Sequence, residues 1–211
     1  QAFMFVGTIE EAAEKARLRA PAVRLWVPDE TIGFQDGHFG VFSQNLLREC
    51  GDFIVRRADG VFAYQLAVVA DDIAMGVTQV VRGRGLLPYT PQQIWLLQEL
   101  DYPPPQYYHI PLLTAPDGRR LSKRDGDLDV GALQKRYGRP EPVVGLLGHW
   151  CGLLDRPEPA AARELVGLFS WEKLPQKDIP LPENFGREWR VRTRHPAGPK
   201  KHKKMPPQLL P

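Results

Sequence analysis

The stretch VTQVVRGRGLLPYTPQQIWLLQELDYPPPQYYHIPLL (77–113) decides the fold. Residues 77–83 are rich in β-branched side chains and end at a glycine, which is typical of a short strand. Thr90 is then expected to be the N-cap of a helix, because a proline follows it at the first turn, and a run of prolines ends that helix. A second apolar strand follows at 106–113. Strand, helix and strand predict a βαβ unit of a parallel sheet, and therefore an α/β fold.

The residues before this unit contain both helix and strand patterns. The run 61–76 has the length and the Ala, Leu and Met content of a helix, although its valines also suit a strand. Because it is apolar nearly throughout, we expect it to be buried. The other predicted elements are a helix after a capping box that starts at Thr8, strands at 22–27 and 52–57, a turn at 58–60, and turns with short strands over 30–50.

The residues after the unit change character. Three short helices are predicted at 130–137, 141–154 and 161–169, with Trp171 and Leu174 packed against the second. The last segment, 186–211, holds eight Lys or Arg residues and a single acid. A segment so rich in lysine and proline cannot bury enough apolar surface to fold alone. It either adds affinity for a phosphate backbone or acts as a solubilising tail.

Composition excludes several classes of protein. No apolar stretch approaches the ~20 residues of a membrane span, and the N-terminus lacks the pattern of a secretory signal. Cys50 and Cys151 are far apart, with no spacing typical of a metal site. We expect both to be small buried side chains of a cytoplasmic protein, and we assign no metal ligand.

Two basic segments follow the strands of the predicted unit. One is Arg82-Gly83-Arg84, and the other is the loop DGRRLSKRDGD (117–127). Ligands of open parallel sheets bind outside the carboxyl ends of the strands, so a common position at this edge favours a phosphate-binding loop. The alternative from residue types alone is a solvated, charged hairpin tip.

The segment RLSKR (120–124) resembles the KMSKS signature of the class I aminoacyl-tRNA synthetases. The run 53–83 (FIVRRADGVFAYQLAVVADDIAMGVTQVVRG), then TPQQIWLLQEL (90–100) and YHIPLLTAPDGRRLSKRDG (108–126), are similar to the glutamate-specific members of that class. The similarity extends weakly from about residue 8 to about residue 182. DGDLDVGAL (125–133), the segment 153–175 and the absence of an anticodon-binding domain resemble most closely the compact glutamyl-Q tRNA(Asp) synthetases.

This resemblance implies ATP-dependent activation of glutamate and transfer of the glutamyl group to tRNA. The partners would be glutamate and a tRNA for Asp or Glu, with ATP and Mg²⁺ as cosubstrate and cofactor, and with no zinc in this chain. It implies that Tyr64 and Arg82 bind glutamate and that the KMSKS-like loop binds ATP, with Lys123 as its key contact. The loop residues are Arg120, Leu121, Ser122, Lys123 and Arg124. We assign no catalytic residue and expect a monomer.

Each of these residues also has a structural reading. Tyr64 alone suits a core aromatic, and Arg82 alone suits a surface ion pair. We expect Asp71 and Asp72 to form a turn at a helix end, and His109 to be a packed strand histidine without a visible partner. Gly85 stands where the family commonly has an acid, which leaves one neighbouring contact in doubt.

The resemblance also implies a division of the chain. We expect a partial Rossmann-like catalytic domain at 1–126, a helical subdomain at 127–185, and a disordered basic tail at 186–211. No sequence like the HIGH motif precedes Thr8, so we expect the second half of the catalytic domain with weak or no activity by itself. The alternatives are a fragment of a glutamyl-tRNA synthetase and a non-catalytic RNA-binding module that uses the tail.

Overall fold

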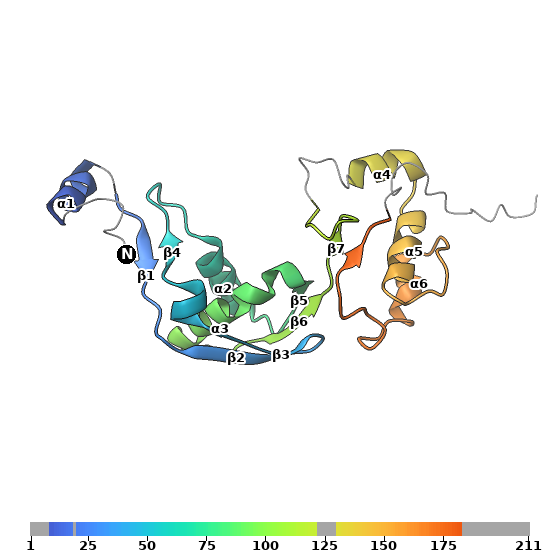
Figure 1. Ribbon diagram of the computed structural model, residues 1–211, viewed down its shortest axis with the longest axis horizontal. Coiled ribbons are helices and arrows are strands. Elements are labelled where there is room, and N and C mark those ends of the chain that lie inside the picture. The colour runs from blue at the N-terminus through green and yellow to red at the C-terminus, as the bar shows by residue number, and fades with distance from the viewer. Residues whose placement is uncertain (1–8, 19, 122–129, 183–211) are drawn as a thin grey trace, which may run out of the picture. The chain divides into compact units, whose positions relative to one another are not determined.

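The computed structural model describes residues 9–18, 20–121 and 130–182 (Figure 1). By its internal contacts the chain divides into two compact units. The first comprises Gln1–Leu112 with Gln176–Asp178, and the second comprises Leu113–Pro175 with Ile179–Pro211. The predicted capping residue Thr8 and the basic tail lie outside the described residues. The three-part division at residues 126 and 185 stays a prediction.

The first unit is built around a four-stranded sheet in the order β3-β2-β6-β5. Strands β5 (Gln79–Gly83) and β6 (Gln106–Ile110) run parallel, with Gln79 opposite Gln106. Helix α3 (Thr90–Glu99) connects them, so the predicted βαβ unit is confirmed. Strand β2 (Thr31–Asp36) pairs in parallel with β6 and antiparallel with β3 (Gly40–Asn45). The expected turns and short strands of 30–50 are therefore a regular hairpin, followed by the π-helical turn η1 (Leu46–Cys50).

The prediction of Thr90 as a helix N-cap is wrong. A 3₁₀ helix, η2 (Arg84–Tyr89), runs directly into α3, and the N-cap position is Tyr89, whose side chain makes no capping bond. Thr90 has no exposed surface, and its hydroxyl donates to the carbonyl oxygen of Leu86 at 3.2 Å. A polar residue before proline does begin this helix, as predicted. Thr90 is not its cap because the residues before it already form a 3₁₀ helix.

Helix α2 (Tyr64–Met75) confirms the helical reading of 61–76 and corrects its expected burial. Only Val69 in this helix is fully buried, whereas Met75 and Tyr64 are 70% and 53% exposed. The helix ends at Gly76, which adopts the left-handed conformation with φ of 63°. A single side of α2 therefore contributes to the core, which also contains Ile32, Leu97 and Tyr107.

Helices α2 and α3 lie on the same side of the sheet (Figure 1). Burial alternates along the strands, so Ile32, Val80 and Tyr107 face the core under α3. Val81 and Val41, at alternate positions, are 60% and 81% exposed. Gln79 and Gln106 on the same strands are exposed too, so within the first unit the face of the sheet away from α3 carries both polar and apolar side chains.

A short antiparallel ribbon completes the first unit. It pairs β1 (Val23–Leu25) with β4 (Phe53–Arg56), and the predicted turn after β4 is closed by the amide of Gly60 donating to the carbonyl of Arg57 at 2.9 Å. Helix α1 (Ile9–Leu18) precedes the ribbon. These strands are shorter than the sequence runs that predicted them.

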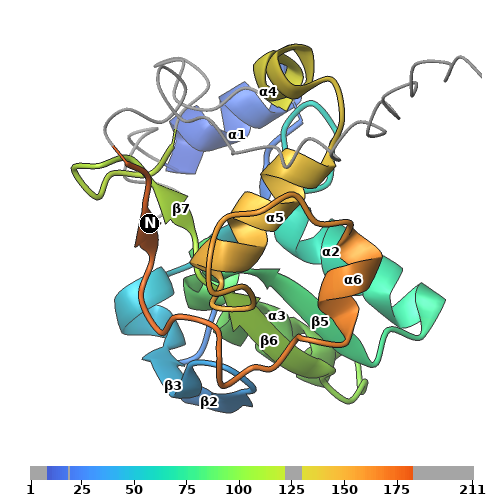
Figure 2. The same cartoon turned by 90° about the vertical axis from the view of Figure 1, so that its right-hand side faces the viewer.

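The second unit contains the three predicted helices: α4 (Val130–Tyr137), α5 (Glu141–Trp150) and α6 (Ala162–Val166). Figure 2 shows α5 and α6 side by side, and a Cβ atom at Gly148 of α5 would lie 3.0 Å from Leu165 of α6. Leu174 is buried. A two-stranded parallel sheet pairs β7 (Leu113–Thr114) with β8 (Ile179–Pro180).

Candidate functional site

Arg82 is the last residue but one of β5, so it lies at the carboxyl end of the strand, just before η2. Its Nε donates to Nε2 of His109 at 3.0 Å, and its Nη2 donates to the hydroxyl of Thr90 at 2.8 Å. Its Cζ lies 5.2 Å from the centre of the Tyr107 ring. The guanidinium is thus held along its side-on edge, which is formed by Nε and Nη2. Among the described residues, none makes a hydrogen bond or ion pair to Nη1, so the end-on edge of Nη1 and Nη2 is open.

His109 is fully buried in β6, as expected for a packed strand histidine, but the expectation that it has no partner is wrong. Its Nδ1 lies 2.6 Å from Oδ2 of Asp36, at the end of the neighbouring strand β2. Because Nε2 accepts the Arg82 hydrogen bond, the ring proton is on Nδ1 and is donated to Asp36. Three adjacent strands therefore contribute one linked set of side chains.

Asp36 is a buried carboxylate whose oxygens are occupied by donors. Burial alone would raise its pKa, but the backbone N–H of Phe39, the ring of His109 and the backbone N–H groups of His38 and His109 together hold the pKa below its usual value. Burial lowers the pKa of His109, against the opposing effect of Asp36. The pair is therefore an aspartate and a neutral histidine at neutral pH.

The charge of Arg82 is balanced by its surroundings. Burial lowers its pKa, which Tyr107, Tyr64, Asp72 and Asp36 oppose, and an arginine remains protonated under such shifts. Burial also raises the pKa of Tyr107 to about 12, so its ring packs beside Arg82 as a neutral phenol. The pKa of Asp72 is raised by burial and lowered by Arg82. Arg82 is consequently a protonated cation in a half-buried region, with Asp72 and Asp36 as the acids that favour its charge.

Tyr64 lies at the first position of α2 and belongs to the same electrostatic region as Arg82. At 53% exposure it is not a core aromatic, and Arg82 is not part of a surface ion pair among the described residues, so both structural readings are wrong. The next residue, Gln65, accepts a hydrogen bond of 2.7 Å from the amide of buried Gln93 on α3. That bond joins the start of α2 to α3.

Asp71 and Asp72 lie in the last turns of α2, as expected for a turn at a helix end. The backbone carbonyl of Asp72 accepts hydrogen bonds from the amides of Gly76 and Val77. In the part of the chain that the structure describes, no three His, Cys, Asp or Glu side chains gather as a metal site.

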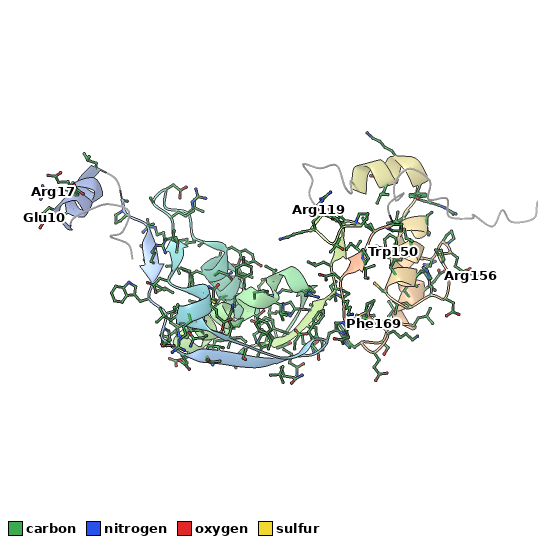
Figure 3. The ribbon with its side chains drawn as sticks, in the orientation of Figure 1. Glu10, Arg17, Arg119, Trp150, Arg156 and Phe169 are labelled. Carbon is green, nitrogen blue, oxygen red and sulfur yellow. The ribbon has the colours of Figure 1, made fainter. Side chains whose placement is uncertain are left out.

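The KMSKS-like loop begins in the second unit. The predicted strand 106–113 is interrupted, because β6 ends at Ile110 and β7 resumes at Leu113 in a different sheet. A tight turn follows β7, in which the amide of Ala115 donates to the carbonyl of Arg119 at 2.9 Å. Arg119, labelled in Figure 3, and Arg120 are exposed, and Leu121 is half-buried. Ser122, Lys123 and Arg124 lie outside the described residues, so a common position of the loop and Arg82 stays a prediction.

Sequence reasoning missed Asp36 and Thr90 as members of this site. Asp36 stands in FQDGHFG, within the stretch 30–50 that we expected to form turns and short strands, and its place at the carboxyl end of a parallel strand would have been the signal. Thr90 was assigned to helix capping, which concealed its bond to Arg82.

Comparison with known proteins places these features in context. Residues 6–148 match the family described as "tRNA synthetases class I (E and Q), catalytic domain". The matched region contains all of Tyr64, Arg82, His109 and the basic loop. It covers more than half of the chain.

Curated relatives include proteins named glutamyl-Q tRNA(Asp) synthetase from three bacteria. The chain is 44% identical over 174 residues to that of Symbiobacterium thermophilum, covering 82% of this chain and 53% of the relative. It is 46% identical over 179 residues to that of Nitratidesulfovibrio vulgaris, covering 84% and 55%. With that of Neisseria meningitidis serogroup B the values are 41% over 186 residues, covering 85% and 61%. The chain spans about half the length of the curated relatives it matches.

Two solved structures share the fold. A glutamate tRNA ligase from Elizabethkingia meningosepticum, determined in complex with its amino acid, matches with a TM-score of 0.63 at 23% identity, covering 85% of this chain and 40% of that one. The glutamate-tRNA synthetase from Elizabethkingia anophelis gives the same values. Of the helices that the structure describes, none combines the length and apolar character needed to cross a membrane.

Proposed function

We propose that this chain, which belongs to the catalytic-domain family of the class I tRNA synthetases for glutamate and glutamine, takes part in the activation of glutamate and its transfer to tRNA. In the first step a glutamate carboxylate oxygen attacks the α-phosphorus of ATP, and pyrophosphate leaves. In the second, a hydroxyl of the RNA attacks the carbonyl carbon of the adenylate, and AMP leaves. The names and identities of the relatives favour the glutamyl-Q tRNA(Asp) kind of acceptor.

The open edge of Arg82 is the observation that carries this proposal. Two parallel N–H groups, on Nη1 and Nη2, match the two oxygens of a carboxylate, and partial burial strengthens the attraction. Tyr64 lies in the same electrostatic region and offers a hydroxyl as a second contact. Amino-acid carboxylate recognition therefore needs no rearrangement of the groups that already hold Arg82.

The loop around Lys123 supplies the ATP contacts in this proposal. Lys123 and Ser122, with Arg120 and Arg124 beside them, would bind the triphosphate and stabilise the charge that moves onto pyrophosphate in the transition state. Because the described residues contain no carboxylate cluster for a metal, Mg²⁺ enters the proposal as the counter-ion of ATP rather than as a resident ion.

Glutamate-dependent exchange of pyrophosphate into ATP, which we expect to be weak in this chain by itself, tests the proposal in the purified protein. Replacing Arg82 by Lys keeps the charge and removes the bidentate edge, so kcat/KM for glutamate should fall about 10- to 100-fold, in line with the strength of hydrogen bonds to charged groups. Arg57→Lys, on the exposed turn after β4, is the matched control and should leave kcat/KM unchanged. Exchange that is equally fast without glutamate, or an Arg82→Lys variant with unchanged kinetics, would contradict the proposal.

The acceptor is tested separately. Transfer of labelled glutamate to tRNA(Asp) that contains queuosine should exceed transfer to tRNA(Glu). The reverse preference would assign the chain to the glutamyl-tRNA synthetase kind instead. Absence of transfer to either RNA, together with normal exchange, would limit the proposal to the activation step.

A further inference from the structure

We infer that Asp36, His109 and Thr90 form a positioning relay that fixes Arg82 by its side-on edge and leaves its end-on edge for the substrate carboxylate. The use of the end-on edge rests on the proposed function. The relay itself rests on the hydrogen bonds that join these four side chains. None of its three members is a catalytic residue, because each acts on substrate only through Arg82.

The relay draws on different parts of the first unit. Asp36 ends β2, His109 belongs to β6 and Thr90 begins α3. These elements place two acceptors, Nε2 of His109 and the Thr90 hydroxyl, at 3.0 and 2.8 Å from the Nε and Nη2 donors of one guanidinium edge. Because all three supporting side chains are buried, with exposures of 0 or 1%, they have little freedom to turn away.

The donor-only chemistry of Arg82 fixes the direction of its two bonds in the relay. Arg82 can only donate, so Nε2 of His109 and the oxygen of Thr90 must accept. The Thr90 hydroxyl donates to the carbonyl of Leu86, and the His109 ring donates from Nδ1 to Asp36. Asp36 thus selects the ring tautomer, and the tautomer in turn orients Arg82.

A purely structural role for the pair of Asp36 and His109 predicts different behaviour. The backbone amide of His109 also donates to Asp36, at 3.1 Å, so β2 and β6 remain linked at this point when the ring is replaced. A replacement that keeps the bond to Asp36 but not the bond to Arg82 should therefore affect glutamate binding more than folding.

Two amides separate these roles. His109→Asn places an amide group near the position of Nδ1, where it can donate to Asp36 but cannot reach Arg82. His109→Gln places its amide near Nε2, where its oxygen can accept from Arg82. We expect the KM for glutamate to rise at least about tenfold in the Asn variant, with kcat changed less, and to stay within about threefold in the Gln variant. Thr90→Ser, which keeps the hydroxyl, should behave like the wild type, whereas Thr90→Val should raise KM.

The decisive readout needs no glutamate. In the wild-type chain, long-range ¹H–¹⁵N correlations of the His109 ring should show the proton on Nδ1, and the Nε–H of Arg82 should exchange slowly with solvent. That exchange should become fast in His109→Asn and stay slow in His109→Gln. A ring protonated on Nε2, or an Arg82 Nε–H that exchanges equally fast in all three proteins, would overturn the relay. A relay that passes this test in a protein that fails to bind glutamate would refute the proposed function alone.

Discussion

Arg82 is a half-buried cation with one open edge, which in our proposal binds a substrate carboxylate. Taking a charge out of water costs free energy unless hydrogen bonds and neighbouring charges compensate it. Here the hydrogen bonds lie on one edge of the guanidinium, and Asp36 adds a negative charge behind that edge, on the far side of the His109 ring. These bonds compensate burial in part and leave the edge of Nη1 and Nη2 open.

Asp36 should be among the most sensitive residues of the first unit. Asp36→Asn presents an N–H group to donors that need an acceptor, and leaving such a buried donor unsatisfied costs about 2–3 kcal/mol. We expect the free energy of unfolding in urea to fall by this amount. The matched control is Asp29→Asn, at an exposed ion pair with Arg48, which should change the denaturation midpoint little. Equal effects of the two replacements would contradict the buried, saturated state of Asp36.

The stability of the first unit should depend on pH through His109 and Asp36. Both have pKa values in the folded protein below their ordinary values, so the folded state binds fewer protons than the unfolded state. Their contribution to the free energy of unfolding is therefore complete above about pH 6.5. On acidification it is lost because the unfolded state takes up protons that the folded state does not, first at His109 and then, near the ordinary range of carboxylates, at Asp36. The charges that face the ring are Asp36 from β2 and Arg82 from β5, while Tyr107 and Thr90 are neutral.

Urea denaturation at about pH 7.5 and about pH 5 measures this dependence. The wild type should lose stability between the two pH values. His109→Gln should lose less, because the amide does not titrate. An equal loss in both proteins would assign the effect to other groups.

At the scale of single elements, Gly145 is the residue on which the packing of α5 depends. A Cβ atom there would overlap the backbone carbonyl of Glu158, which cannot move independently of its chain. Gly145→Ala should therefore destabilise the second unit by at least about 2 kcal/mol. At Gly148, on the same helix, the added Cβ meets only the side chains of Leu165 and Leu154, at 3.0 and 3.3 Å.

The midpoints of thermal unfolding of the two alanine variants compare a steric clash with the backbone, at Gly145, and a contact with side chains, at Gly148. Gly148→Ala should be close to neutral, because the flexible leucines shift and alanine favours the helix by about 1 kcal/mol. If Gly145→Ala were as stable as Gly148→Ala, the close approach of α5 to residues 158–160 would be wrong.

The elements predicted best from the sequence are those whose bounds depend on neighbouring residues alone. Helices α2 and α3 begin and end within a few residues of their predicted bounds, because their apolar composition and their glycine or proline ends act locally. The strand at 106–113 was predicted too long, since Pro111 lacks the N–H that a ladder needs and the chain changes sheet there. Short strands were expected within 30–50, but the regular pairing of β2 with β3 was not predicted, because the glycines and aromatic residues of this stretch also indicate turns.

The site was predictable only in part, for a related reason. Tyr64 could be proposed from the resemblance, and Arg82 from the resemblance and from its place at the end of a strand. The partners of Arg82 could not, because Asp36 meets His109 through a parallel pairing between β2 and β6 that no local pattern specifies. Burial of a histidine is visible in a sequence, but the identity of its acceptor is a property of the assembled sheet.

At the scale of the whole molecule, the segment Gln176–Asp178 belongs to the first unit although its sequence neighbours belong to the second. The Asp178 carboxylate accepts from the amide of Leu112 at 2.8 Å and lies 3.6 Å from Arg84, whose guanidinium stacks over Phe39. The Gln176 amide donates to the carbonyl of His38 at 2.9 Å. These contacts hold the segment Gln176–Asp178 within the first unit.

Replacing Asp178 by Ala should release this segment without unfolding the first unit. The amide of Leu112 loses its acceptor, so its hydrogen exchange should become markedly faster, while the amides of β5 and β6 keep their protection. Glu172→Ala, at an exposed position of the second unit, is the control and should leave Leu112 unchanged. Unchanged protection of Leu112 in the Asp178 variant would show that the carboxylate does not hold the segment.

The long separation between Asp36 and His109 has a consequence for the order in which the protein is made. The ribosome releases Asp36 into solution 73 residues before it releases the ring that Asp36 will bind. During that interval β2 and β3 can pair as a hairpin, but the carboxylate has no ring to bind and the parallel half of the sheet does not yet exist. The nascent chain must therefore delay closing its first unit until β6 emerges, and the contacts of Gln176–Asp178 with the first unit can form only after that segment has been synthesised as well.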